Sequence, residues 1–125
     1  MQGYVNENYE AVISLVVRNG TKLKSIKALI DTGFTGFLSL PMSLITELDL
    51  SWKYRDRGTL GDGSETVFDI YEGNVIWDGE YREIEINQAE TEPLVGMMML
   101  KDYRLQIDTT PGGLVTIENL SHTIN

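Results

Sequence analysis

The chain has 125 residues, 42% of them hydrophobic, no cysteine and a formal net charge of -9. This length suits one compact domain over residues 1–125 with its own hydrophobic core. Because 19 acidic residues oppose 10 basic ones without a basic stripe, we expect neither nucleic acid nor an anionic membrane surface as a partner.

The missing residue types narrow the possible chemistry further. Without cysteine the chain has no thiol nucleophile, disulfide or thiolate metal site. The only histidine, His122, lies close to the C-terminal end, which disfavours a Ser-His-Asp triad or a histidine zinc site. We therefore expect no metal and no cofactor. The polar start Met1 to Glu7 is unlike a signal peptide, so a cytoplasmic location is expected.

The first part of the chain predicts a hairpin, a strand that enters a turn, and a short helix. The β-rich run 12–17 ends at Asn19-Gly20, a strong hairpin signal, and the return strand covers 22–30. A second apolar strand follows the turn after residue 30. Pro41 then opens a short amphipathic helix with apolar residues at positions 42, 44, 45 and 48.

The rest of the chain predicts further hairpins and one more short helix. A turn at 61–63 and an Asp-Gly pair at 78–79 each separate two strand-like runs. The apolar run 94–100 is expected to change at Gly96 from a buried strand into a helix that ends near Tyr103. The fold class is therefore mainly β, with expected strands at 52–58, 65–71, 74–77, 81–86, 105–108 and 114–117.

The tripeptide Asp31-Thr32-Gly33 gives the strongest indication of chemistry. The apolar residues before it deliver a carboxylate into a tight, glycine-bearing turn. Two carboxylates held close together cannot both ionise easily, so one serves as an acid and the other as a base. The tripeptide occurs once, so a site with two aspartates needs two copies of the chain. The alternative is that Asp31 is only a turn residue.

Two further segments have supporting roles in this hypothesis. Leu94-Val95-Gly96 is expected to pack beneath the turn and brace it, although such an apolar run can also be ordinary core. The segment Thr59-Leu60-Gly61-Asp62-Gly63 is expected to form a flap that closes over a substrate. An ordinary hairpin turn is the alternative for this segment.

Together these residues resemble the clan AA, retropepsin-like aspartic proteases, and in particular a bacterial and archaeal group that carries Asp-Thr-Gly-Phe-Thr-Gly. Here that signature runs from Asp31 to Gly36. The resemblance implies a closed β-barrel with one or two short helices, acting as a homodimer on a peptide or protein substrate. It implies that Asp31 is catalytic, that Thr32 and Gly33 support its loop, and that pepstatin-like compounds inhibit. Met97-Met98 stands where related enzymes often have Arg-Asn or Arg-Asp.

Three functions remain open at this stage. The first is an aspartic endopeptidase in which two Asp31 carboxylates activate water. The second is a catalytically silent module of the same fold that binds extended peptides or a protein partner, since a fold alone does not fix function. The third is a self-associating structural protein in which Asp31 has no chemical role. Replacing Asp31 by Asn separates the first function from the other two.

Overall fold

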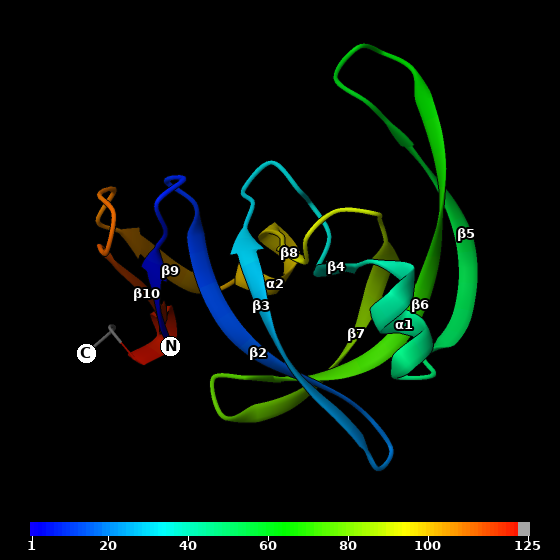
Figure 1. Ribbon diagram of the computed structural model, residues 1–125, viewed down its shortest axis with the longest axis horizontal. Helices are drawn as coiled ribbons and strands as arrows, with labels where there is room; N and C mark the ends of the chain where they lie inside the picture. The colour runs from blue at the N-terminus through cyan, green and yellow to red at the C-terminus, as the bar shows by residue number, and fades with distance from the viewer. Residues whose placement is uncertain (123–125) are drawn as a thin grey trace.

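Six strands close into a barrel, and the same hydrogen-bonded sheet continues at one end into a three-stranded part, here called the second sheet (Figure 1). A computed structural model describes residues 1–122, so the last three residues of the expected domain 1–125 lie outside it. The strands are β1 (Gln2–Val5), β2 (Ala11–Asn19), β3 (Lys22–Ile30), β4 (Leu38–Leu40), β5 (Ser51–Thr59), β6 (Glu65–Trp77), β7 (Glu80–Gln88), β8 (Leu94–Val95), β9 (Tyr103–Ile107) and β10 (Leu114–Asn119). The helices are α1 (Met42–Glu47), α2 (Met97–Leu100) and the 3-10 turn η1 (Leu120–His122).

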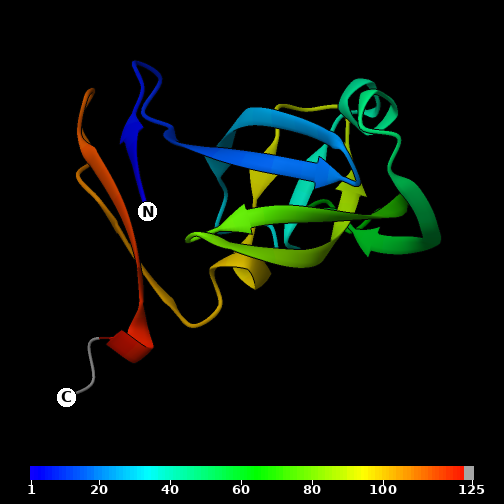
Figure 2. The same ribbon diagram turned by 90° about the horizontal axis from the view of Figure 1, so that it is seen from below.

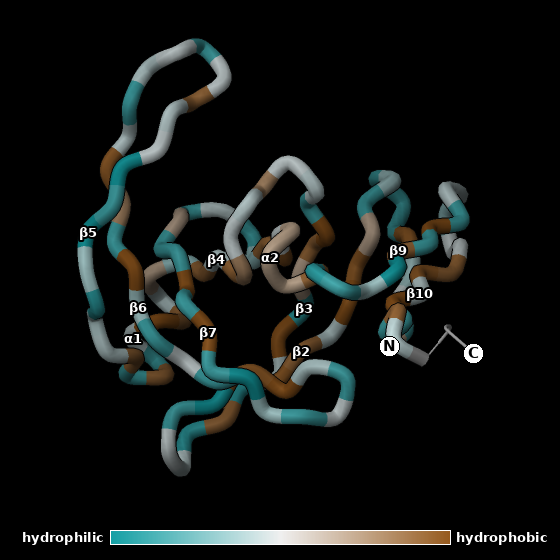
Figure 3. Tube along the Cα trace, turned by 180° about the vertical axis from the view of Figure 1, so that it is seen from behind, coloured by the Kyte–Doolittle hydropathy of each residue, from teal (hydrophilic) through white to brown (hydrophobic). Residues whose placement is uncertain are grey.

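The barrel closes because β6 pairs with two strands. Around the ring the order is β6-β7-β4-β8-β3-β2, and β2 then pairs with β6 again through Val16↔Ile76. Apolar residues are frequent along β2 and β3, as the colouring of Figure 3 shows, and Ile13, Val17 and Ala28 of these strands are buried. The expected mainly β, closed-barrel fold with short helices is confirmed. The most deeply buried core side chains include Ile13, Val17, Leu38, Leu40, Val75, Trp77, Ile86 and Met99.

The second sheet joins the two ends of the chain. β1 pairs with β10 on one side and continues to β2 on the other, and β9 forms the outer edge. Figure 2 shows this sheet standing away from the barrel. Gly3 permits the crossing from one sheet to the other, because a Cβ there would lie 2.8 Å from the side chain of Ile13. The sequence did not predict β1, whose polar residues acquire their extended form only by this pairing.

A tight turn follows at both hairpin signals. Asp78-Gly79 joins β6 to β7 as expected, whereas the turn from β2 to β3 is Gly20-Thr21, one residue later than expected, because Asn19 still belongs to β2 and pairs with Lys22. Gly20 and Gly79 have positive φ angles of 60° and 83°, the left-handed conformation that such turns require.

Two expected boundaries are wrong. The runs 65–71 and 74–77 are one continuous strand, because Gly73 is not a break: a Cβ there would lie 2.7 Å from Ile86 Cδ1. The glycine thus allows close packing inside the barrel. The helix after Gly96 ends at Leu100 and not near Tyr103, because Asp102 adopts a positive φ of 69° and turns the chain into β9.

Candidate active site

Asp31 lies where β3 ends and the chain turns. Its backbone N–H donates to the Val95 carbonyl at 2.9 Å, which extends the pairing of β3 with β8 by one residue. The carboxylate Oδ1 accepts the N–H of Gly33 at 2.9 Å, and the Asp31 carbonyl accepts the N–H of Phe34 at 3.1 Å. These bonds fix both the backbone and the carboxylate of Asp31, which is half-buried.

The start of α2 lies directly against this turn. The N–H of Gly96 donates to the Phe37 carbonyl at 3.0 Å, and the N–H of Met97 donates to the Phe34 carbonyl at 2.8 Å. A Cβ on Gly96 would lie 2.6 Å from the Phe34 carbonyl oxygen, so only glycine fits. Leu94 and Val95 of β8 and the following Gly96 thus lie against this turn, and their bracing role stays a prediction. We call the turn from Asp31 to Phe37 the aspartate loop.

Arg82 also supports this region and was missed by the sequence analysis. From β7 its guanidinium donates to the Met99 carbonyl at 3.2 Å and lies 5.9 Å from the centre of the Phe37 ring. Arg82 thus joins α2 to the residue at the end of the aspartate loop. Arg82 thus supplies a side-chain hydrogen-bond donor at α2, which the side chains of Met97 and Met98 do not have. Nothing local in the sequence distinguishes Arg82 from the other charged residues of its strand.

A cleft of about 590 Å³ separates the aspartate loop from the β5–β6 hairpin. Figure 1 shows this hairpin projecting on the same side of the barrel as the loop that follows β3. Among the residues singled out in the sequence, Asp31, Gly33, Thr59, Leu60 and Leu94 line the cleft. Val95 and Gly96 lie beneath the loop, and the side chain of Thr32 is exposed.

The tip of the β5–β6 hairpin extends beyond the cleft lining. The N–H of Leu60 donates to the Ser64 carbonyl at 2.7 Å, and a Cβ added to Gly61 would meet no atom within 4 Å. The pKa of Asp62 is lowered by bonds from the Ser64 hydroxyl and backbone N–H, so this carboxylate stabilises the turn itself. Gly61, Asp62 and Gly63 therefore form an open tip.

The floor of the cleft is a row of side chains on the outer face of the barrel. Ser39 of β4 lies in register with Asn87 of β7 and with Leu94 of β8. Leu38 and Leu40 are fully buried in the core, so the alternation of β4 directs Ser39 to the opposite face. Ile84 and Ile86 are buried, so the alternation of β7 directs Asn87 to the same outer face, and no local sequence signal gives the register that unites this row.

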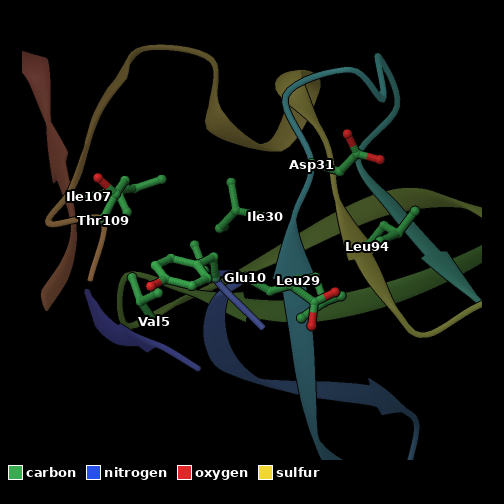
Figure 4. A pocket seen from close by; sticks show the side chains of 10 residues that line it. Val5, Glu10, Leu29, Ile30, Asp31, Leu94, Ile107 and Thr109 are labelled. Atoms are coloured by element: carbon green, nitrogen blue, oxygen red, sulfur yellow. The ribbon is translucent and has the colours of Figure 1, made fainter. Parts of the chain in front are cut away.

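Asp31 also borders a second hollow, of about 340 Å³, on the side of the terminal sheet. Figure 4 shows Ile30 of β3 and Ile107 on opposite sides of this space, with Asp31 at its rim. The lining is mostly apolar, and Tyr9 on the β1–β2 turn is 69% exposed. Asp31 thus lies between an apolar hollow and the cleft under the hairpin.

Within residues 1–122, no cluster of three or more potential metal-ligating side chains is present. Over the same residues, no helix is long and apolar enough to cross a membrane. The polar groups around Asp31 in the aspartate loop are its own carboxylate and backbone N–H groups such as that of Gly33.

The comparisons with known proteins concern the fold. A retropepsin-like aspartic protease from Rickettsia conorii superposes with a TM-score of 0.63 over 95% of this chain and 88% of that one, at 19% identity. The fold is that of the retropepsins. The EIAV protease, solved with the inhibitor HBY-793, gives a TM-score of 0.55 over 74% of this chain and 86% of that one, at 14% identity. No protein-family model matches the sequence, and no curated protein does.

Proposed function

We propose that the protein is an aspartic endopeptidase of the bacterial and archaeal Asp-Thr-Gly-Phe-Thr-Gly group, active as a homodimer. The observation that carries this proposal is the position of Asp31. Its carboxylate is oriented by a backbone donor, at the edge of a cleft that is covered by a projecting hairpin. A binding protein does not need such an arrangement around a carboxylate.

One chain supplies one half of the required acid–base pair, so the second Asp31 comes from another copy. The hollow of Figure 4 supports this assembly, since it leaves apolar surface of Ile30, Leu94 and Ile107 uncovered beside the carboxylate. A second copy that covers this surface brings its own Asp31 to the same edge. The exposed side chain of Thr32 is then free to hydrogen-bond to the opposing loop.

The two carboxylates share one proton when they face each other, because a second negative charge nearby opposes ionisation. The ionised carboxylate removes a proton from a water molecule as the water oxygen attacks the peptide carbonyl carbon. The protonated carboxyl gives its proton to the carbonyl oxygen. The carboxyl that took the proton from water then gives it to the amide nitrogen as the bond between nitrogen and carbon breaks. The other carboxylate takes a proton from one of the two hydroxyl groups of the intermediate, which becomes the carboxylic acid product.

The β5–β6 hairpin acts as the flap. Thr59 and Leu60 contact the peptide, and Gly61, Asp62 and Gly63 close over it. Strand-like backbone bonds between flap and peptide favour an extended substrate. Phe34, Val67, Phe68 and Leu94 line the cleft and favour apolar side chains beside the scissile bond. A single domain over 1–125 and the cytoplasmic location expected from the sequence are part of this proposal.

The test is cleavage of a diverse peptide mixture from about pH 3.5 to about pH 7.5, with wild type and Asp31→Asn in parallel. We expect wild-type cleavage, inhibition by a pepstatin-like compound, and a loss of about 100-fold or more in the variant. Sedimentation of the same samples measures whether the active species is a dimer.

Two outcomes contradict the proposal. Equal cleavage by both proteins excludes Asp31 as the catalytic group. No cleavage by folded wild type at any pH, together with peptide binding, assigns the chain instead to the silent peptide-binding module.

A further inference from the structure

The cleft has two chemically different ends. One part is apolar and includes Phe34 of the aspartate loop together with Leu60 and Phe68 of the β5–β6 hairpin. The other part is polar and lies around the end of β7 and the loop that follows it. The residues of this polar end are Ser39, Asn87, Gln88, Glu90 and Thr91. This division predicts that a bound peptide places one polar side chain at the polar end and apolar side chains elsewhere in the cleft.

The hydroxyl of Ser39 indicates that the polar end is built for a ligand group. Ser39 is 3% exposed, and its Oγ has no hydrogen-bond partner among the described residues. A buried hydroxyl without a partner is costly, and most such groups in folded proteins are paired. Because Ser39 belongs to the cleft floor, a bound polar group there would supply the missing bond.

Glu90 gives this end its charge and is held in place by two donors. The N–H of Met42 and the side-chain amide of Gln88 both donate to its Oε2, each at 2.8 Å. These bonds lower the pKa of Glu90, so it is ionised at neutral pH. Its second oxygen, Oε1, has no hydrogen-bond partner within residues 1–122 and remains available as an acceptor.

The charges of the cleft have one sign. Asp31 and Glu90 are the charged residues in its lining, and no Lys, Arg or His of the described chain is among the lining residues. The formal net charge of -9 adds a negative field around the cleft. A cationic side chain therefore meets attraction at this end, and an acidic one meets repulsion.

We propose that Ser39, Asn87 and Glu90 form a subsite for a basic side chain, so that the enzyme selects extended peptides with Lys or Arg at one position near the scissile bond. This specificity rests on the proposed function. The ammonium or guanidinium group donates to Glu90 Oε1, to Ser39 Oγ and to the side-chain oxygen of Asn87. The remaining positions of the peptide keep the apolar preference of the cleft.

The test uses quenched fluorescent peptides in which each position around the scissile bond is changed in turn to Lys, Gln or Glu. At one position, we expect kcat/KM to be about fivefold higher with Lys than with Gln, and lower still with Glu. Glu90→Gln keeps an acceptor for Met42 and is expected to reduce the Lys-to-Gln ratio to about one. Glu92→Gln is the matched control, because Glu92 lies in the same loop but does not line the cleft.

Binding measured with Asp31→Asn separates this inference from the proposed function. If wild type cleaves nothing, yet Asp31→Asn binds a Lys peptide more tightly than its Gln counterpart and Glu90→Gln removes the difference, the subsite stands and the endopeptidase proposal fails. If wild type cleaves but shows no preference for Lys at any position, the subsite is excluded. An equal loss of preference in Glu90→Gln and Glu92→Gln also excludes it, since only the general field would then act.

Discussion

The aspartate loop and the flap tip are both glycine-bearing turns, but their surroundings are opposite. The aspartate loop is bonded to residues 95–98 through Asp31, Phe34, Gly36 and Phe37, with backbone hydrogen bonds of 2.8–3.1 Å. Among residues 1–122, the backbone bonds of the flap tip lie within the tip itself, between Leu60 and Gly63 or Ser64. Gly96 allows close approach beneath the loop, whereas a Cβ on Gly61 would meet no atom within 4 Å. The candidate site thus combines a carboxylate held by a neighbouring segment with an open hairpin tip.

The largest expected effect is that of Gly96→Ala. The new Cβ would press on the Phe34 carbonyl oxygen, and overpacking of this kind costs about 1–3 kcal/mol. We expect a lower free energy of unfolding in urea and a loss of activity, because the aspartate loop must shift. Gly61→Ala is the control, and its free energy of unfolding should change by no more than about 0.5 kcal/mol. Similar losses in both variants would contradict the contrast between loop and tip.

Arg82→Met is expected to have the next largest effect. The substitution keeps much of the side-chain volume but leaves the Met99 carbonyl without its donor, at a cost of about 1–3 kcal/mol. Arg57→Met is a matched change on the flap, where Arg57 is 77% exposed and its ion pair with Glu65 spans 3.9 Å. Thermal unfolding of both variants measures the difference. An equal shift in Tm would show that Arg82 does not support α2.

Leu60→Ser tests the flap tip through substrate binding. Leu60 is 52% exposed and lines the cleft, so its removal should change the free energy of unfolding little. We expect KM for an apolar peptide to rise about threefold to tenfold, with a smaller change in kcat. A fall in stability with unchanged KM would place Leu60 in the fold and not in substrate contact.

The smallest effect concerns the base of the flap at low pH. The Trp52 indole and then Arg55 lower the pKa of Asp69, and Lys53 and then Tyr54 lower the pKa of Glu85. Lowered values mean that these bonds contribute stability above the ordinary values of 3.8 and 4.5. That stability is lost as the pH falls through the folded-state values.

Tm measured at a series of acidic pH values checks this prediction. We expect Tm to fall less steeply with acidification in the double variant Asp69→Asn, Glu85→Gln than in wild type. Parallel curves for the two proteins would contradict the assignment. An aspartic peptidase whose two carboxyl groups share a proton can be active in acid. The loss of the Asp69 and Glu85 bonds therefore falls within the pH range in which activity is to be measured.

Much of the framework was predictable from local sequence signals. The hairpin dipeptides at Asn19-Gly20 and Asp78-Gly79 and the alternation of β7 each depend on near neighbours. The turn at Asp31-Thr32-Gly33 and its brace at Gly96 were also predictable, because both appear as apolar runs interrupted by glycine. Their catalytic roles stay predictions.

The remaining features depend on pairing between distant segments. β1 becomes a strand by pairing with β10 and β2, which are distant in the sequence. Gly73 resembles a strand break in the sequence, but in the fold Ile86 occupies the space that a side chain at position 73 would need. Ser39 lines the cleft because β4 lies between β7 and β8, and Arg82 reaches α2 across the barrel. Residues close together in the sequence do not indicate these pairings, which form only when distant segments meet in the fold.

The continuity of β6 has a mechanical consequence. From Ile70 to Trp77 this strand is part of the barrel wall and pairs with β7, whereas from Glu65 to Asp69 it pairs only with β5. One strand thus connects the projecting hairpin to the seam with β2 that closes the barrel. In the proposed enzyme, closure of this hairpin over a peptide would bend β6 near Ile70, while the pairing of β6 with β2 and β7 holds its other end in place.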